Sequence, residues 1–147
     1  MKALYAGSFD PFTLGHQNIV ERSLPFCETL TIGIGHNVTK KGLYTVEQRK
    51  EQIESLYADN PKVRVVIYST LTTDLAQEIQ ADCLIRSVRS VQDFESEQQI
   101  AEVNKRLSGI ETWILFADAH LSCISSSVVR ELHHFDKDIS SFLPKKE

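Results

Sequence analysis

One short segment near the N-terminus combines residue types that can bring backbone and side chains close to a small charged ligand. The segment 5-YAGSFDPFTLGH-16 places a small-residue turn, a proline and a Gly-His pair directly after the first apolar stretch. Gly7 permits a tight turn, and Gly15 at a helix start leaves room for an anion at the positive N-terminal end. His16 would project from the first helical turn towards the same space. A capped turn with a surface histidine is the simpler alternative, but Gly, Asp, Pro, Thr and His together within residues 7–16 favour a ligand site.

Cationic residues and hydroxyl groups follow later apolar stretches. Lys40 and Lys41 come after the second stretch, and Arg86 and Arg89 come after the fourth. A lysine pair alone indicates only an exposed loop, whereas two arginines directly after a buried strand are a more specific sign of an anion site than of a solvated turn. The serine triplet at residues 125–127 could simply cap a helix, which is the commoner role of serine. It could also present hydroxyl and backbone N–H groups to a phosphate.

The hydrophobic pattern predicts the elements that would position these residues. Apolar stretches typical of strands buried on both faces alternate with segments of helical periodicity, which indicates a single α/β domain over residues 1–147 with a doubly wound parallel sheet. The predicted strands are residues 3–5, 29–34, 63–68, 83–85 and 112–116. The predicted helices are residues 17–23, 46–57, 74–79, 91–107 and 128–133, with a short one at 139–142. Thr45 and Gln48 have the spacing of a capping box at the start of the second helix.

The candidate residues all follow predicted strands. In doubly wound sheets, ligands bind beyond the carboxyl ends of the strands, where the connecting loops gather. The five loops expected there are residues 7–10, 36–41, 69–73, 86–89 and 117–127. We therefore expect one site at this edge of the sheet, built from cations, hydroxyl groups and a histidine.

The composition excludes several classes of function. A chain of 147 residues with 41% hydrophobic and 24% charged residues is typical of a soluble globular protein, and its formal net charge of −4 argues against a protein that coats nucleic acid. No apolar run is long enough to cross a bilayer, and residues 1–2 lead into a strand rather than a signal peptide. Cys27, Cys83 and Cys123 are odd in number and lack C-x-x-C spacing, so we expect reduced, mostly buried thiols. The expectation is a cytoplasmic protein that binds neither nucleic acid nor a membrane.

The opening segment also carries a family resemblance. Residues 7–16, GSFDPFTLGH, closely resemble the nucleotidyltransferase signature G-S/T-F-D-P-x-T/H-x-G-H, and Thr13 in place of histidine resembles the bacterial phosphopantetheine adenylyltransferase family. Four later segments resemble motifs of the same family: 39-TKK-41, 84-LIRSVRSVQDFESEQQIA-101, 124-ISSS-127 and 138-DISSFLP-144. The arginine-containing block is the most specific of these. The resemblance covers nearly the whole chain and implies a Rossmann-like nucleotidyltransferase fold.

The resemblance implies a reaction between two phosphates. The family transfers the adenylyl group of ATP to 4'-phosphopantetheine, giving dephospho-coenzyme A and pyrophosphate by in-line attack with no covalent enzyme intermediate. The attacking phosphate is largely ionised at pH 7, so positioning and positive charge matter more than a general base. Mg²⁺ is expected to travel with ATP, with no metal site formed by the protein. The family also implies a homo-hexamer.

The same resemblance assigns roles to individual residues. His16, Lys40 and Arg89 would be catalytic, with His16 donating a hydrogen bond to the ATP phosphates as the transition state forms. The residues expected to bind the acceptor substrate are Ser8, Lys40, Thr72 and Arg86. The residues expected to bind ATP are Ser8, Phe9, His16, Ser87, Val88, Arg89, Glu97, Leu121, Ser122, Cys123, Ile124, Ser125, Ser126 and Ser127. For Glu97, solvation or pairing with a lysine or arginine at residues 105–106 is the alternative.

Some positions depart from the family pattern, and other functions stay open. Ser87 stands where the family has glycine, Ser96 replaces a tyrosine, and Gly42 replaces a proline. These changes bear on contacts with adenine and pantetheine rather than on the reaction class. Nicotinamide mononucleotide adenylyltransferases and glycerol phosphate cytidylyltransferases share the opening motif, usually with histidine at the position of Thr13. A non-catalytic nucleotide sensor is a further alternative, against which the retained histidine, lysine and arginines speak.

Overall fold

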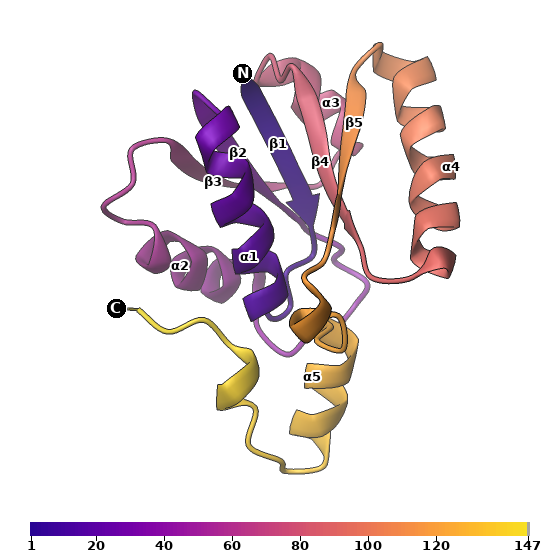
Figure 1. Cartoon of the computed structure of the whole chain (residues 1–147). Coiled ribbons are helices and arrows are strands. Elements are labelled where there is room, and N and C mark those ends of the chain that lie inside the picture. Colours follow the sequence, from indigo (N-terminus) through magenta and orange to yellow (C-terminus); the bar gives the residue numbers. More distant parts are fainter. Residues whose placement is uncertain (147) are drawn as a thin grey trace.

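The short apolar stretches of the chain pair into one parallel sheet. In the computed structural model, which describes residues 1–146, the strand order is β3-β2-β1-β4-β5 (Figure 1). The strands are β1 (Lys2–Gly7), β2 (Thr29–Gly35), β3 (Val63–Tyr68), β4 (Cys83–Val88) and β5 (Glu111–Phe116). The predicted parallel α/β sheet is confirmed, and its order reverses between β1 and β4, where doubly wound sheets bind ligands. The predicted domain extends to residue 147, which lies outside the described residues.

Helices lie on both faces of the sheet and beyond its carboxyl edge. The helices are α1 (Leu14–Ser23), α2 (Val46–Leu56), α3 (Thr72–Glu78), α4 (Val91–Ser108) and α5 (Ser126–His134). Single 3-10 turns occur at Leu24–Phe26 (η1), Ala119–Leu121 (η2) and Ser140–Phe142 (η3), the last within the predicted short helix. Figure 1 shows α5 and the C-terminal segment beyond the ends of the strands, so this edge of the sheet is partly covered.

Two buried clusters fix the helices to the sheet. Ile19 of α1 and Ile53 of α2 lie in one cluster with the strand residue Tyr5. Leu75 of α3 packs with Leu4 in the other cluster. Because successive residues of a strand point to opposite faces, β1 contributes to both clusters and is held rigidly between them. The turn that follows β1 therefore starts from a strand that is buried on both faces.

Helix starts are set by capping side chains. α1 begins three residues earlier than predicted because Thr13 forms a capping box with His16. The predicted capping box of α2 is confirmed, since the Thr45 side chain accepts a hydrogen bond from the backbone N–H of Gln48. α5 begins two residues earlier than predicted because the Ser125 side chain caps it. Each of these caps lies at the carboxyl edge of the sheet, next to the expected site.

The prediction that residues 86–89 form a loop is wrong for most of this segment. Arg86, Ser87 and Val88 are the last three residues of β4 and pair with the end of β5. The polar side chains ended the apolar pattern, but backbone pairing continues for as long as the neighbouring strand does. Thr72 likewise lies in α3 rather than in the predicted loop.

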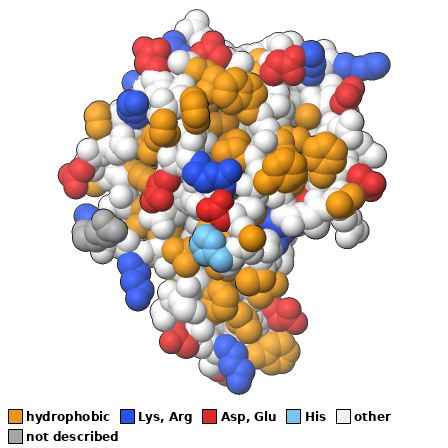
Figure 2. Space-filling model, viewed as in Figure 1, with side chains coloured by type: hydrophobic (Ala, Val, Ile, Leu, Met, Phe, Trp, Pro, Cys, Tyr) orange, Lys and Arg blue, Asp and Glu red, His pale blue; other side chains and the backbone are white. Residues whose placement is uncertain are grey.

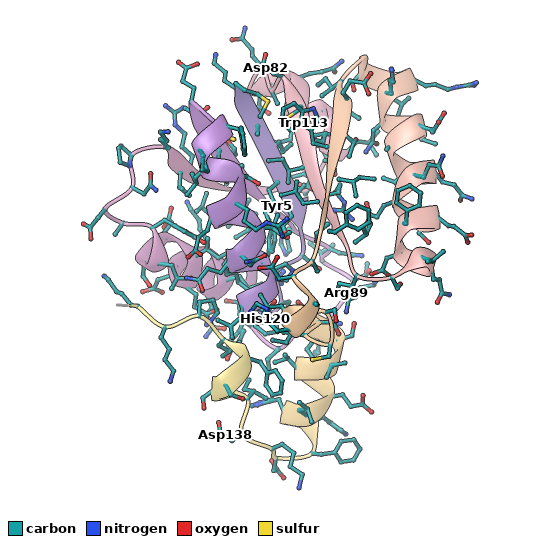
Figure 3. The ribbon with its side chains drawn as sticks, in the orientation of Figure 1. Tyr5, Asp82, Arg89, Trp113, His120 and Asp138 are labelled. Carbon is teal, nitrogen blue, oxygen red and sulfur yellow. The ribbon has the colours of Figure 1, made fainter. Side chains whose placement is uncertain are left out.

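Trp113 differs from its predicted surroundings, whereas the thiols are mostly buried as expected. Trp113, interpreted from the sequence as a core residue, is 47% exposed on the edge strand β5 (Figure 3). Cys27 and Cys83 are buried as expected, whereas Cys123 is exposed, and all three are free thiols. Among the described residues, none of the helices combines the length and the apolar character needed to cross a membrane.

Candidate active site

The turn after β1 forms the centre of the site. Phe9 adopts a left-handed backbone conformation with φ of 49° and turns its ring into the core, where it is 2% exposed. A Cβ atom on Gly7 would lie 3.2 Å from this ring, so glycine at position 7 allows the Phe9 ring to pack closely against the backbone of its own turn. The Phe9 ring meets the imidazole of His16 edge to face, with centroids 5.0 Å apart. Phe9, expected to bind ATP, therefore supports the histidine with its side chain.

The hydrogen bonds of His16 fix its tautomer. Its Nδ1 atom accepts the backbone N–H of Thr13 at 3.0 Å, and the Thr13 hydroxyl lies 3.2 Å from the same atom. A ring nitrogen that accepts an N–H carries no proton, so the proton of the neutral ring is on Nε2. Burial, together with the nearby guanidinium groups of Arg89 and Arg86, lowers the pKa of His16 to about 4. At neutral pH this side chain is an uncharged N–H donor.

A cavity of about 290 Å³ opens at the carboxyl edge of the sheet, and we call it the histidine cavity. Besides Gly15 and Thr13, it is lined by Arg89, which lies just beyond the end of β4 (Figure 3), and by Asp93 and Arg130. It gathers most of the residues expected to bind ATP. Those lining it are Ser8, His16, Ser87, Arg89, Glu97, Leu121, Ile124, Ser125, Ser126 and Ser127.

A second cavity, of about 250 Å³, adjoins the first, and we call it the lysine cavity. Ser8 and Arg130 line both cavities, so the two spaces meet at these side chains. The lysine cavity is also lined by Lys40 and Lys41, which lie between β2 and α2. Of the three residues expected to be catalytic, His16 and Arg89 thus line one cavity and Lys40 lines the other.

Arg86 and Glu97 form a two-pronged ion pair. Arg86 Nε lies 2.7 Å and Nη2 lies 2.6 Å from the two carboxylate oxygens, and Nη1 donates to the carbonyl of Ala6 at 2.7 Å. The hydrogen bonds to Glu97 raise the pKa of Arg86 above its ordinary value. They use three of the five N–H groups of the guanidinium, so two remain for a ligand. Glu97 thus pairs with Arg86 rather than with Lys105 or Arg106, and Lys105 pairs with Glu111.

The hydroxyl groups of the serine triplet already have protein partners. The Ser125 oxygen accepts the N–H of Val128, so the capping explanation holds for this residue. Ser126 Oγ donates to the carbonyl of Pro11 at 2.8 Å, which ties α5 to the turn after β1. Ser127 Oγ accepts a hydrogen bond from Arg130 at 3.1 Å. All three still line the histidine cavity.

Several predicted site residues lie away from both cavities. Thr72 is the first residue of α3, and its hydroxyl lies 2.9 Å from the hydroxyl of Tyr68. Val88 is 2% exposed in β4. Ser122 donates to a backbone carbonyl of its own turn, and Cys123 is exposed. Neither these four nor Phe9 and Arg86 are among the residues that line either cavity.

Sequence reasoning did not single out Asp10, Arg49 or Arg130 as site residues. Arg130 Nη1 donates to the carbonyl of Asp10 at 2.7 Å and lies where the two cavities meet. Its position four residues after Ser126 places both on one helix face, so helical periodicity could have found it. Asp10 and Arg49 are distant in sequence, and only the fold brings them together.

The combined site can bind anions at two adjoining places. Arginine side chains and a neutral imidazole N–H donor face one cavity, and two lysines line the next. Such preorganised donors can stabilise charge that develops on phosphate oxygens. Within residues 1–146, no group of three or more His, Cys, Asp and Glu side chains is placed to hold a metal ion.

Known proteins share this sequence over nearly its full length. The family described as cytidylyltransferase-like matches residues 4–132. The chain is 48% identical over 144 residues to a phosphopantetheine adenylyltransferase of Bacteroides thetaiotaomicron, covering 98% of this chain and 95% of that relative. It is 50% identical over 143 residues to a phosphopantetheine adenylyltransferase of Porphyromonas gingivalis, covering 97% and 94% of the two chains.

A solved structure supports the fold alone. The lipopolysaccharide core biosynthesis protein from Thermoplasma volcanium superposes with a TM-score of 0.58 at 18% identity, covering 80% of this chain and 96% of that one. The sequence matches are much closer, since they extend over almost the whole length of both partners at about half identity. On these matches, the chain belongs to the phosphopantetheine adenylyltransferase family of cytidylyltransferase-like proteins.

Proposed function

We propose that this protein transfers the adenylyl group of ATP to 4'-phosphopantetheine, giving dephospho-coenzyme A and pyrophosphate. The single observation that carries the proposal is the pair of cavities that meet at Ser8 and Arg130. Two phosphate-bearing ligands can then approach each other from neighbouring spaces. The names of the relatives, which are phosphopantetheine adenylyltransferases, support this choice of ligands.

In the proposed reaction, ATP occupies the histidine cavity and the acceptor phosphate occupies the lysine cavity. An oxygen of the acceptor phosphate forms a bond to the α-phosphorus of ATP while the bond to the bridging oxygen of pyrophosphate breaks. His16 Nε2–H donates to a phosphate oxygen as its charge increases, and Arg89 neutralises the phosphates. Lys40 holds the incoming phosphate. The chain therefore acts by positioning and by fixed positive charge.

Arg86 and Thr72 contribute on the acceptor side of this proposal. Arg86 is not among the residues that line the lysine cavity, but Glu97 keeps its guanidinium in place and two of its N–H groups are spare to bind the attacking phosphate. Thr72 begins α3, and we place the pantetheine arm along this helix. Glu97 also lines the histidine cavity, so one carboxylate connects the acceptor arginine to the nucleotide side.

Mg²⁺ enters the proposal as part of the ATP complex. The ion binds phosphate oxygens readily and keeps several of its waters, so it needs few protein ligands. When bound, it would offset the negative charge of the phosphates. The carboxylates of Asp93 and Glu97 in the histidine cavity are both engaged by arginines, which suits a metal held by the nucleotide.

The assignment of ligands to cavities can be tested by calorimetric titration of each ligand separately. Lys40→Ala should weaken binding of 4'-phosphopantetheine at least about tenfold, the equivalent of 1.4 kcal/mol, and leave the affinity for Mg-ATP within twofold. Arg89→Ala should show the reverse pattern. An equal loss of affinity for both ligands in both variants would contradict the assignment. Binding of ATP without any binding of the acceptor would favour a nucleotide sensor.

We further propose that copies of the chain assemble, as a homo-hexamer, through the edge of the molecule formed by α4 and the edge strand β5. None of the residues of α4, all of which are described, is buried, and Val91, Trp113 and Phe116 are 77%, 47% and 69% exposed. Figure 2 shows hydrophobic side chains gathered on the side of the molecule that carries these elements. A second copy is the partner we propose for this apolar surface.

The free thiols fit a reducing compartment, and we place the reaction in the cytoplasm.

A further inference from the structure

The lysines of the lysine cavity lie on a loop that contacts the turn after β1 through a few buried side chains. We call residues 36–45, between β2 and α2, the lysine loop. Lys40 and Lys41 are exposed, and within the loop the backbone is supported by turn hydrogen bonds around Asn37. These local bonds do not determine where the loop sits relative to the turn after β1. Its position must come from contacts elsewhere.

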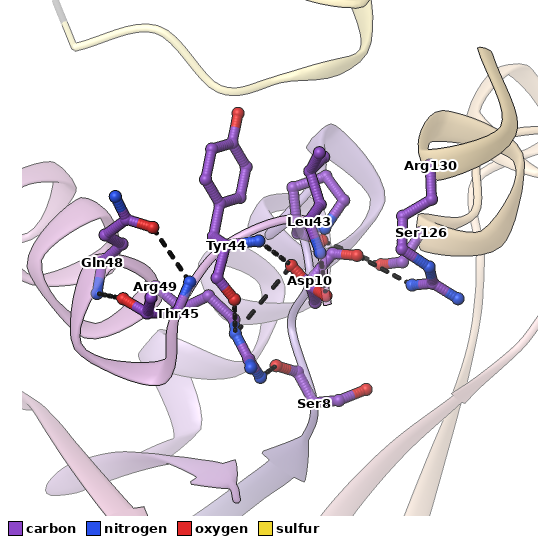
Figure 4. A network of polar contacts seen from close by, with 10 residues as sticks. Ser8, Asp10, Leu43, Tyr44, Thr45, Gln48, Arg49, Ser126 and Arg130 are labelled. Carbon is purple, nitrogen blue, oxygen red and sulfur yellow. Dashed lines mark hydrogen bonds and ion pairs between the residues drawn. The ribbon is translucent and has the colours of Figure 1, made fainter. Parts of the chain in front are cut away.

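The carboxylate of Asp10 supplies such contacts. This side chain is in a residue only 5% exposed, and its two oxygens accept the backbone N–H groups of Leu43 at 2.8 Å and Tyr44 at 2.9 Å (Figure 4). Hydrogen bonds to an ionised acceptor are about twice as strong as neutral ones. Asp10 therefore holds the end of the lysine loop against the turn that carries Ser8.

The approach of Asp10 to the loop depends on Gly42. A Cβ atom on Gly42 would lie 2.0 Å from Asp10 Oδ2 and 2.9 Å from its carboxyl carbon. The Asp10 side chain is buried and bonded on both oxygens, so it cannot move aside easily. In the arrangement seen here, a Cβ at position 42 must displace either the carboxylate or the loop.

Arg49 of α2 binds the same two segments from the other side. Its Nη1 donates to the carbonyl of Ser8 at 2.8 Å, its Nε donates to the carbonyl of Tyr44 at 3.1 Å, and the residue is 8% exposed. The Nε atom lies 3.9 Å from Asp10 Oδ1, which balances the buried charges. Figure 4 shows this network continuing through Arg130, which donates to the Asp10 carbonyl from α5.

We propose that Asp10, Gly42 and Arg49 are positioning residues that lock the lysine loop onto the turn after β1 and thereby fix the lysine cavity for the acceptor phosphate. The proposal rests on the proposed function for the identity of that phosphate, but the lock itself does not depend on it. Asp10, Gly42 and Arg49 line the lysine cavity together with Lys40. Lys40 binds the phosphate, and the contacts of the other three with the loop and the turn set where Lys40 lies. When these contacts are lost, His16 and Arg89 stay in place in the histidine cavity, whereas Lys40 and Lys41 are displaced.

The lock is tested first without any ligand, by amide hydrogen exchange. Asp10→Asn places an amide N–H₂ against one of the two loop N–H groups, and Gly42→Ala introduces the clash with Oδ2. Both variants should increase exchange of the Leu43 and Tyr44 amides about tenfold or more, because one or both charge-assisted bonds are lost. Exchange in β2 should stay as in the unsubstituted protein. Glu51→Gln, an exposed charge removal on α2, is the matched control.

Activity gives a second readout. Both variants should raise KM for 4'-phosphopantetheine about tenfold while KM for ATP changes less than about twofold. Unchanged exchange at residues 43–44 in both variants would overturn the proposal, as would exchange that increases equally throughout β2 or equal losses for the two substrates. If the unsubstituted protein turns over no 4'-phosphopantetheine, the proposed function fails, and the exchange result still decides whether the lock exists.

Discussion

At the scale of single residues, the site depends on a histidine that is kept uncharged. The backbone N–H of Thr13 occupies His16 Nδ1, and the rings of Phe9 and Phe12 lie against the imidazole with centroids 5.0 and 5.4 Å away. Arg89 and Arg86 add positive charge nearby, which disfavours a second proton on the ring. The residue is thus prepared to donate one hydrogen bond, from Nε2, rather than to act as a general base.

The lowered pKa of His16 predicts how stability depends on pH. The imidazole of His16 binds a proton near pH 6.5 in the unfolded chain and, because its pKa is lowered to about 4, only near pH 4 in the folded ligand-free protein. The free energy of unfolding should therefore decrease as pH falls between these values. The loss should be roughly 1–3 kcal/mol. His16→Gln should remove it, as measured by urea unfolding between these pH values. A His16 that titrates near 6.5 in an NMR titration would contradict the assignment.

His16 should matter for turnover more than for ground-state binding. Because its hydrogen bond strengthens as charge develops, His16→Ala is expected to lower kcat by about 10²–10³-fold and to change the dissociation constant of ATP little. Steady-state kinetics and equilibrium ATP binding measure the two effects. Equal losses in kcat and in ATP affinity would show that the histidine only binds the nucleotide.

At the scale of secondary structure, the ion pair of Arg86 and Glu97 joins β4 to α4. The side chains are 31% and 13% exposed, so removing one partner leaves the other in a poorly solvated place. Glu97→Gln should lower the free energy of unfolding by about 1–3 kcal/mol. Glu111→Gln breaks the exposed ion pair between Glu111 of β5 and Lys105 of α4. It should lower the free energy of unfolding by less than about 1 kcal/mol. Similar losses in the two variants, measured by chemical denaturation, would argue against a structural role for the partly buried pair of Arg86 and Glu97.

The elements themselves were largely predictable from sequence, and the errors have physical causes. All five strands and six helical segments were expected where they occur, because apolar runs and capping residues such as Thr45 are local signals. The end of β4 was missed since Arg86 and Ser87 interrupt the apolar pattern without interrupting the pairing with β5. Trp113 was placed in the core because the sequence does not reveal that β5 is an edge strand.

At the scale of the whole molecule, the fold brings together segments that are far apart in sequence. Parallel topology alone predicted that the loops after the strands would meet at one edge, and ten predicted ATP-binding residues do line one cavity there. The sequence could not predict which polar side chains pair with one another. Asp10 with the lysine loop and Arg130 with the turn after β1 are contacts across 33 to 120 positions, and they depend on the packing of complete elements.

The exposed apolar face predicts assembly at this scale. Phe116→Glu and Trp113→Glu place charges on the side of the molecule that we propose is covered by another copy. Light scattering should give several times the mass of one chain for the unsubstituted protein and a smaller mass for the variants, because burying an unpaired charge is costly. Arg64→Glu, an exposed change on the opposite edge strand β3, is the control and should leave the mass unchanged. A monomeric unsubstituted protein would contradict the proposal.

The most direct test of the central claim is pyrophosphate release by the purified protein with Mg-ATP and a panel of acceptors. We predict turnover with 4'-phosphopantetheine and formation of dephospho-coenzyme A, identified by its mass, with no turnover of nicotinamide mononucleotide. Glycerol 3-phosphate offered with CTP should also be inactive. Turnover with one of these other acceptors instead, or no pyrophosphate release despite measurable ATP binding, would contradict the account.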